Sequence, residues 1–191
     1  MAKWLEKSYN SENIVLLRGN HDLALIKLLT YDKVSPIDDY VQIQLMIKSN
    51  GLDMTLSGLL GREYNEYKDI YIDVAKEINE RYPKLLEVLQ NTKFYHETDK
   101  AIYTHAYLPK DYKTASSKSW EGYVWRDSFS WAHSQLWKTM KTELTKKVVI
   151  GHFSLSNLPQ WDGYNPHNLM GITFADGGLA WGYDGVINII E

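Results

Sequence analysis

Cysteine is absent from the 191 residues, which excludes disulfides, thiol nucleophiles and cysteine-ligated zinc sites. The chain also has no long run of Lys and Arg, and its formal net charge is -3. This charge argues against a nucleic-acid partner. No apolar stretch approaches the roughly 20 residues needed to cross a bilayer, and the first residues do not read as a signal peptide. We therefore expect a cytoplasmic protein with no membrane partner.

Hydrophobic periodicity predicts helices mainly in the first half of the chain and strands mainly in the second. Helices are predicted over residues 23–29, 36–48, on both sides of Pro83 within 64–90, and over 127–143. Strands are predicted over 14–17, 94–97, 101–105, 147–150 and 171–176, with a closing hairpin turn at Tyr183-Asp184-Gly185. Asp22 stands where a helix N-cap is expected, and residues 109–122 are expected to form a loop. The order favours a layered α/β or α+β fold, and the length fits one domain, residues 1–191.

Three of the six histidines follow directly after predicted strands. His21 comes after Ile14–Leu17 with Asn20 beside it, His105 ends the strand from residue 101, and His152 follows Ile150-Gly151. A single histidine of this kind is more often a structural residue, but three such positions together favour a site. Imidazole nitrogens with a carboxamide oxygen suit manganese, iron or zinc. The pattern predicts a metal site at the carboxyl ends of buried strands.

The same segments resemble the motifs of calcineurin-like metallophosphoesterases, in the branch that contains bacterial Ser/Thr and dinucleoside-tetraphosphate phosphatases. The motifs are Arg18-Gly19-Asn20-His21-Asp22, Trp125-Arg126, Tyr103-Thr104-His105-Ala106, Val149-Ile150-Gly151-His152 and Phe174-Ala175-Asp176-Gly177-Gly178. Three details depart from the family pattern. Tyr107 replaces a usual Gly, Phe153 stands where Thr is common, and the Trp-Arg spacing is one residue short.

This resemblance implies a role for each matched residue. Asn20, His105 and His152 would hold one divalent metal, with manganese favoured over iron or zinc. His21 would act as general acid on the leaving alkoxide, and Asp22 would orient its ring. Arg18 and Arg126 would bind the phosphate, although an ordinary surface or ion-pair role for Arg126 stays equally open. The substrate would be a phosphoprotein, a dinucleoside polyphosphate or a small phosphomonoester.

Two family motifs have no counterpart in the chain. No histidine has Asp two positions before it, and the dipeptide Gly-Asp does not occur, so the Asp-x-His and Gly-Asp-x-x-Asp-Arg-Gly motifs are missing. The resemblance therefore implies a four-layer αββα sandwich that is truncated at its N-terminus, with half of the dinuclear site absent and activity impaired. The strand over residues 14–17 would lose its parallel neighbours, so we expect self-association into a homo-oligomer through an exposed sheet edge.

Two other classes of function stay open. The chain could be a catalytically inactive interaction or dimerisation module that keeps the phosphatase fold. A nucleic-acid-binding role for the tryptophan-rich segment 120–137 is a third reading, which the scattered Lys and Arg disfavour. Bound metal after purification would favour the enzyme, whereas a stable metal-free dimer would favour the module.

Overall fold

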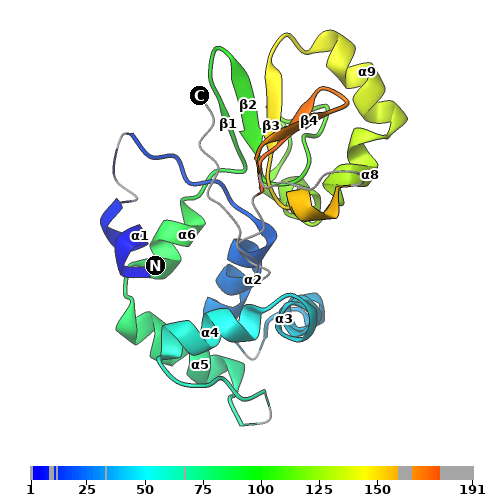
Figure 1. Cartoon of the computed structure of the whole chain (residues 1–191). Coiled ribbons are helices and arrows are strands. Elements are labelled where there is room, and N and C mark those ends of the chain that lie inside the picture. Colours follow the sequence, from blue (N-terminus) through cyan, green and yellow to red (C-terminus); the bar gives the residue numbers. More distant parts are fainter. Residues whose placement is uncertain are drawn as a thin grey trace. The chain divides into compact units, whose positions relative to one another are not determined.

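A computed structural model describes residues 2–8, 11, 13–32, 34–66, 68–158 and 165–176. The chain divides after Thr92 into two compact units, residues 1–92 and 93–191 (Figure 1). We call them the helical unit and the sheet unit. Taken together, their described elements are mixed α/β, as expected at the level of fold class. The assignment of residues 1–191 to one domain stays a prediction.

Six helices make up the described secondary structure of the helical unit. They are α1 (Ala2–Ser8), α2 (Asn20–Leu29), α3 (Ile37–Ser49), α4 (Leu52–Leu60), α5 (Tyr71–Arg81) and α6 (Leu85–Gln90). Helix α2 is central, because it contacts α3, α5 and α6. Leu28 of this helix is fully buried, as are Ile43 of α3, Leu56 of α4 and Ile78 of α5. The helices predicted over 23–29, 36–48 and on both sides of Pro83 are confirmed.

Local chemistry fixes where these helices begin and end. Helix α3 begins after Pro36 and ends at Ser49, with Asn50 as its C-cap. Gly51 then adopts a positive φ of 73°, a conformation that costs glycine little. The prediction of Asp22 as N-cap is wrong, because α2 begins earlier, with Gly19 as its N-cap. The Asp22 carboxylate instead reaches back one turn and accepts a hydrogen bond from the Gly19 N–H (2.8 Å), as third-position acids do in capping boxes.

The strand predicted over residues 14–17 does not form. Ile14, Val15 and Leu16 lie in no regular element, and Leu17 makes an isolated bridge. Val15 is 38% exposed, so this apolar run is not the buried strand that its composition suggested. Apolarity alone does not make a strand, since a strand needs a neighbour to take its backbone hydrogen bonds. The sheet edge expected to drive self-association is therefore missing at this segment, and the homo-oligomer stays a prediction.

The described part of the sheet unit is a five-stranded mixed sheet with three helices. Its elements are β1 (Tyr95–Glu97), β2 (Ala101–Thr104), α7 (Ser117–Tyr123), α8 (Ser128–Ala132), α9 (Gln135–Glu143), β3 (Lys147–Ile150), a 3₁₀ turn (Leu155–Asn157), β4 (His167–Leu169) and β5 (Ile172–Phe174). The strand order is β1-β2-β3-β5-β4, in which β2, β3 and β5 run parallel and the two outer strands are antiparallel. Figure 1 shows α8 and α9 beside this sheet. Buried tryptophans and the apolar faces of the central strands form its core.

Two predictions for this unit need correction. The segment 109–122 is not all loop, because the Ser116 side chain caps α7 and Trp120 anchors that helix in the core. The helix predicted over 127–143 is broken between α8 and α9. There the Ser134 side chain accepts a hydrogen bond from the Trp137 N–H (3.1 Å) and starts a new helix, an alternative to helix continuation that serine readily offers.

The strands predicted at 94–97, 101–105, 147–150 and 171–176 are confirmed as β1, β2, β3 and β5, within a residue or two. The turn of Tyr183-Asp184-Gly185 lies outside the described residues. In the part of the chain that the structure describes, no helix has the length and apolarity to cross a membrane.

Candidate functional site

His105 and His152 meet at one edge of the sheet. Strands β2 and β3 are parallel neighbours with Thr104 opposite Ile150, so the residues that follow them emerge side by side. His105 Nε2 lies 3.0 Å from His152 Nδ1, and the rings are tilted by 59° with centroids 4.7 Å apart. The Gly151 N–H also donates to the His105 carbonyl (2.9 Å). The structure thus brings together two histidines that are 47 residues apart in sequence.

The backbone at His152 has an uncommon conformation. Its φ is +64°, a region that is uncommon for residues other than Gly, although Asn, Asp and His adopt it more often than most. The Phe153 N–H donates to the Gly151 carbonyl (2.7 Å) across His152, which closes a tight turn of the strained, positive-φ kind. Such strain persists where the surroundings hold the residue in place, and it is often found at functional sites. The turn fixes the direction in which the imidazole leaves the strand.

The N-terminus of α8 packs beside the histidine pair. The buried Ser128 hydroxyl donates to the carbonyl of Ala106 (2.8 Å), which ties the helix to the segment after His105. Desolvation acts to raise the pKa of Asp127, but hydrogen bonds from Ser130 and Phe129 and the nearby His152 outweigh it, so the pKa lies below its ordinary value. Asp127 is therefore a carboxylate within electrostatic reach of His152. Reasoning from the sequence missed this residue, although Asp before Ser-Phe-Ser is a recognisable N-cap signal.

Arg126 belongs to the same neighbourhood. It is exposed, and its positive charge acts on the Tyr107 hydroxyl. Burial and Tyr123 raise the pKa of Tyr107, and Arg126 opposes them. Arg126 therefore lies near the segment that follows His105. No ion pair involves it among the described residues, which leaves its guanidinium accessible to an anion. Its role in phosphate binding stays a prediction.

In the helical unit, His21 and Asp22 line one cavity of about 490 Å³. The rest of its wall is largely apolar, with Leu25 and Leu52 among the lining residues. Burial of part of the ring lowers the pKa of His21, although the residue as a whole is exposed and Asp22 acts in the opposite direction. Burial raises the pKa of Asp22, and this effect exceeds the lowering by the hydrogen bond from the Gly19 N–H and by the charges of His21 and Arg18. An imidazole beside a carboxyl group is an arrangement that can take up or release a proton.

The two remaining predicted residues of this segment have clear structural surroundings. Asn20 is 5% exposed as the first residue of α2. Arg18 donates through Nε to Thr92 Oγ1 (2.9 Å), and through one terminal nitrogen to the carbonyls of Leu89 (3.1 Å), Gln90 (2.6 Å) and Thr92 (3.2 Å). The guanidinium thus covers the C-terminal end of α6, where carbonyls lack helical partners. Whether it also binds phosphate is a separate prediction.

The predicted site residues therefore fall into two sets. His105, His152 and Arg126 belong to the sheet unit, and residues 18–22 belong to the helical unit. Asp176 follows β5, the other parallel neighbour of β3, and its carbonyl accepts from the Leu155 N–H (3.0 Å). Across the described residues, no cluster of three or more His, Cys, Asp or Glu side chains could hold a metal ion. Of the three predicted metal ligands, the sheet unit contains His105 and His152, which the structure brings together.

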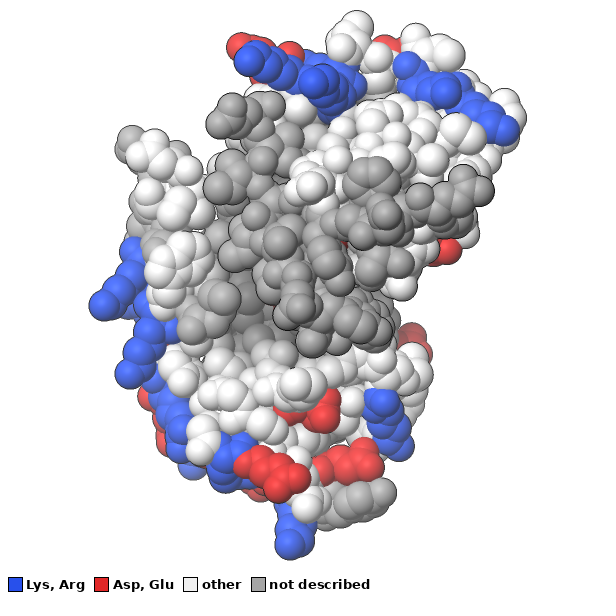
Figure 2. All heavy atoms as spheres, viewed as in Figure 1, with Lys and Arg blue, Asp and Glu red and all other residues white. Residues whose placement is uncertain are grey.

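Figure 2 shows acidic and basic side chains next to one another over the helical unit. Comparison with known proteins adds nothing to these observations: no protein-family model, curated protein or solved structure matches the chain.

Proposed function

We propose that this chain is a metal-dependent phosphoesterase that hydrolyses a phosphate ester, with His105 and His152 as metal ligands. The observation that carries the proposal is the pair of imidazole nitrogens 3.0 Å apart at the carboxyl ends of two parallel strands. Ligand sites of open α/β sheets are found at this edge. The strained turn at His152 supports the proposal, because it fixes one ring in a conformation that costs free energy.

The spacing of the two nitrogens fits one shared ion. Zinc–nitrogen distances in proteins are about 2.0–2.1 Å, so two nitrogens on one such ion at an angle between 90° and 109° lie roughly 2.8–3.4 Å apart. The observed 3.0 Å, which is also a hydrogen-bond distance between the two rings, falls in that range. Imidazole ligands suit zinc, iron and manganese, and we favour manganese. The resemblance adds Asn20 as a third ligand.

The other residues have roles that follow from their chemistry. A divalent ion supplies Lewis-acid stabilisation to the negative charge of a phosphoryl group. Arg126 would contact phosphate oxygens through charge-assisted hydrogen bonds. His21 would hold the proton that the leaving alkoxide needs, with Asp22 orienting the ring. Burial lowers the pKa of His21, which favours the neutral ring and so opposes this role at neutral pH.

The proposal extends to the fold and to the level of activity. We propose an αββα metallophosphoesterase sandwich that acts in the cytoplasm on a phosphoprotein, a dinucleoside polyphosphate or a small phosphomonoester. Because the motifs for the first metal and for the bridging carboxylate are missing from the sequence, metal binding and turnover should be weaker than in a phosphatase with a complete dinuclear site. Self-association remains part of the proposal, without the strand edge at residues 14–17.

Calorimetric titration with Mn²⁺ tests the metal site. We expect one ion per chain, and His105→Ala or His152→Ala should weaken binding by more than about tenfold. His96→Ala is the matched control, because His96 lies on β1 of the same sheet and pairs with Tyr103; its affinity should equal that of the unmodified chain. Equal affinity in all four proteins, or no binding, would contradict the proposed ligands.

A chromogenic phosphomonoester with added Mn²⁺ tests the chemistry. We expect slow hydrolysis that His105→Ala and His21→Ala both abolish. Turnover as fast as that of a complete dinuclear phosphatase would refute the inference of an impaired site. No hydrolysis and no bound metal, together with a stable dimer by light scattering, would favour the inactive interaction module.

A further inference from the structure

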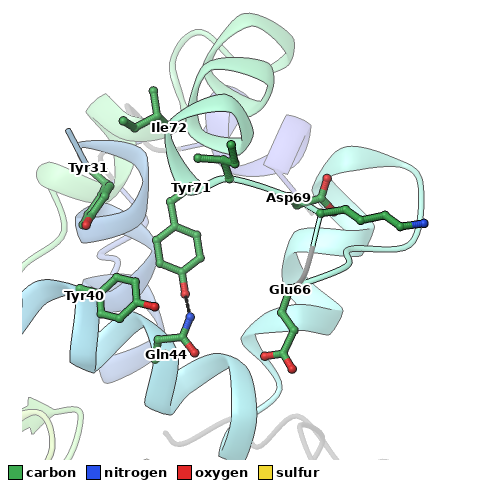
Figure 3. A pocket seen from close by; sticks show the side chains of 9 residues that line it. Tyr31, Tyr40, Gln44, Glu66, Asp69, Tyr71 and Ile72 are labelled. Atoms are coloured by element: carbon green, nitrogen blue, oxygen red, sulfur yellow. Dashed lines mark hydrogen bonds between the residues drawn. The ribbon is translucent and has the colours of Figure 1, made fainter. Parts of the chain in front are cut away.

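A separate cavity in the helical unit is walled by tyrosines and carboxylates. Its volume is about 290 Å³, and its lining comes from the end of α2, from α3 and from the segment that leads into α5. Figure 3 shows Tyr31, Tyr40 and Tyr71 on one side of this space and Glu66 across from them. None of its lining residues is among those assigned to the phosphoesterase site. What it binds is therefore a separate question.

The tyrosine rings form a fixed wall. Tyr71 meets Tyr31 edge-on with centroids 5.6 Å apart and meets Tyr40 at a tilt of 40° with centroids 5.7 Å apart. Gln44 Nε2 donates a hydrogen bond to the Tyr71 hydroxyl, which holds the ring in place; Tyr71 is only 7% exposed. Tyrosine faces carry the negative part of the ring quadrupole and attract cations within about 6 Å.

The acidic side of the cavity contains one carboxylate that is paired and one that is not. Asp69 pairs with Arg62 (3.0 Å) and accepts from the Asn65 N–H (2.7 Å), so its charge is already compensated. No hydrogen bond or ion pair engages the Glu66 carboxylate among the described residues. Glu66 also lines an adjoining hollow of about 380 Å³, together with Tyr64. It is thus available as a counter-ion from two sides.

Tyr64 lines the adjoining hollow and is 7% exposed. Burial raises the pKa of Tyr64 to about 12, with further contributions from the negative charges of Asp69 and Glu66. Asp69 and Glu66 therefore create a negative potential at the Tyr64 hydroxyl, beside the cavity, and this potential favours a positively charged ligand.

We propose that this cavity binds a small organic cation with an alkylated ammonium group, with Tyr40 and Tyr71 as aromatic walls and Glu66 as counter-ion. The volume admits a small head group rather than a drug-sized molecule. Aromatic faces with a nearby carboxylate recognise such a cation because it is weakly hydrated and carries its charge over a broad apolar surface. Lys68 also lines the cavity, and its like charge opposes the ligand.

A pair of probes of the same shape tests the charge. Choline and its neutral isostere 3,3-dimethyl-1-butanol are titrated into the full chain and followed by calorimetry. We expect saturable choline binding and binding of the neutral probe weaker by about tenfold or more. Equal binding of the two probes, or no saturable choline binding at concentrations on the order of 10 mM, would overturn the proposal.

Variants then test the residues. Glu66→Gln should weaken choline binding by about fivefold, and Tyr40→Ala, at a 40% exposed residue that is not needed for the core, should weaken it by about threefold or more. Glu63→Gln is the matched control, since Glu63 is exposed in the same segment and does not line the cavity. Lys68→Gln should strengthen binding. Loss of binding in Lys68→Gln, or an unchanged affinity in Glu66→Gln, would contradict a cation site.

Discussion

Replacing Arg18 with Ala should destabilise the helical unit, because one guanidinium serves several acceptors at the end of α6. Four acceptors lie within 3.2 Å of its Nε and one terminal nitrogen. These two nitrogens carry three N–H groups, so at most three independent hydrogen bonds form. Each contributes about 1 kcal/mol net in a partly exposed setting, and the charge adds a favourable interaction with the helix C-terminus. We expect the free energy of unfolding to fall by about 2–3 kcal/mol.

Urea unfolding followed by circular dichroism at 222 nm measures this change. Arg18→Lys keeps the charge but reaches fewer acceptors, so it should lose about half as much. Arg81→Ala is the control within the same unit, because its 47% exposed guanidinium makes one ion pair with Glu77 (3.1 Å); its effect should stay below about 0.5 kcal/mol. An Arg18→Ala effect as small as that of the control would show that the guanidinium does not stabilise α6.

Three further predictions concern other parts of the chain. Hydrogen bonds from Lys146 and then Lys113 lower the pKa of Glu97 from 4.5 to about 2. The ionised Glu97 carboxylate therefore stabilises the fold fully above pH 4.5, and this contribution is lost as the pH falls to about 2. The difference in urea midpoint between the unmodified chain and Glu97→Gln should shrink over that interval. Trp137→Phe should cost about 1–3 kcal/mol by urea unfolding followed by tryptophan fluorescence, because Trp137 is 2% exposed and its Nε1 donates to the Met170 carbonyl (2.9 Å). Gly58→Ala, inside α4 with no atom within 4 Å of the new Cβ, should raise the melting temperature, with a gain of about 0.5–1 kcal/mol.

Local sequence signals predicted most helices and strands because the deciding interactions lie within a few residues. Helix α3 begins after Pro36 and ends before Asn50-Gly51, as expected. Thr98 closes the β1–β2 turn by donating its N–H to the Ala101 carbonyl (2.8 Å). The strand prediction for residues 14–17 was wrong because strand formation depends on a partner that is distant in sequence. Helices α7 and α9 begin at serine side chains, whose capping role depends on whether the following aromatic residue finds a place in the core.

The candidate site was predictable only in part for the same reason. His105 and His152 could be placed after strands from their apolar neighbours, but their 3.0 Å approach depends on the parallel pairing of β2 with β3. Asp127 was missed because its position beside His152 results from the packing of α8, which no short motif encodes. The tyrosine cavity was missed as well, since it combines residues from three separate elements.

The division of the chain after Thr92 also has a spectroscopic consequence. Trp4 is the one tryptophan before that boundary, and the other six follow it. Tryptophan emission therefore reports mainly on the sheet unit, whereas most of the described helix, and with it the signal at 222 nm, belongs to the helical unit. If each unit unfolds cooperatively by itself, the two signals will give different urea midpoints for the same sample. Arg18→Ala will then shift the ellipticity curve and leave the emission curve in place, so one titration yields the stability of each half separately.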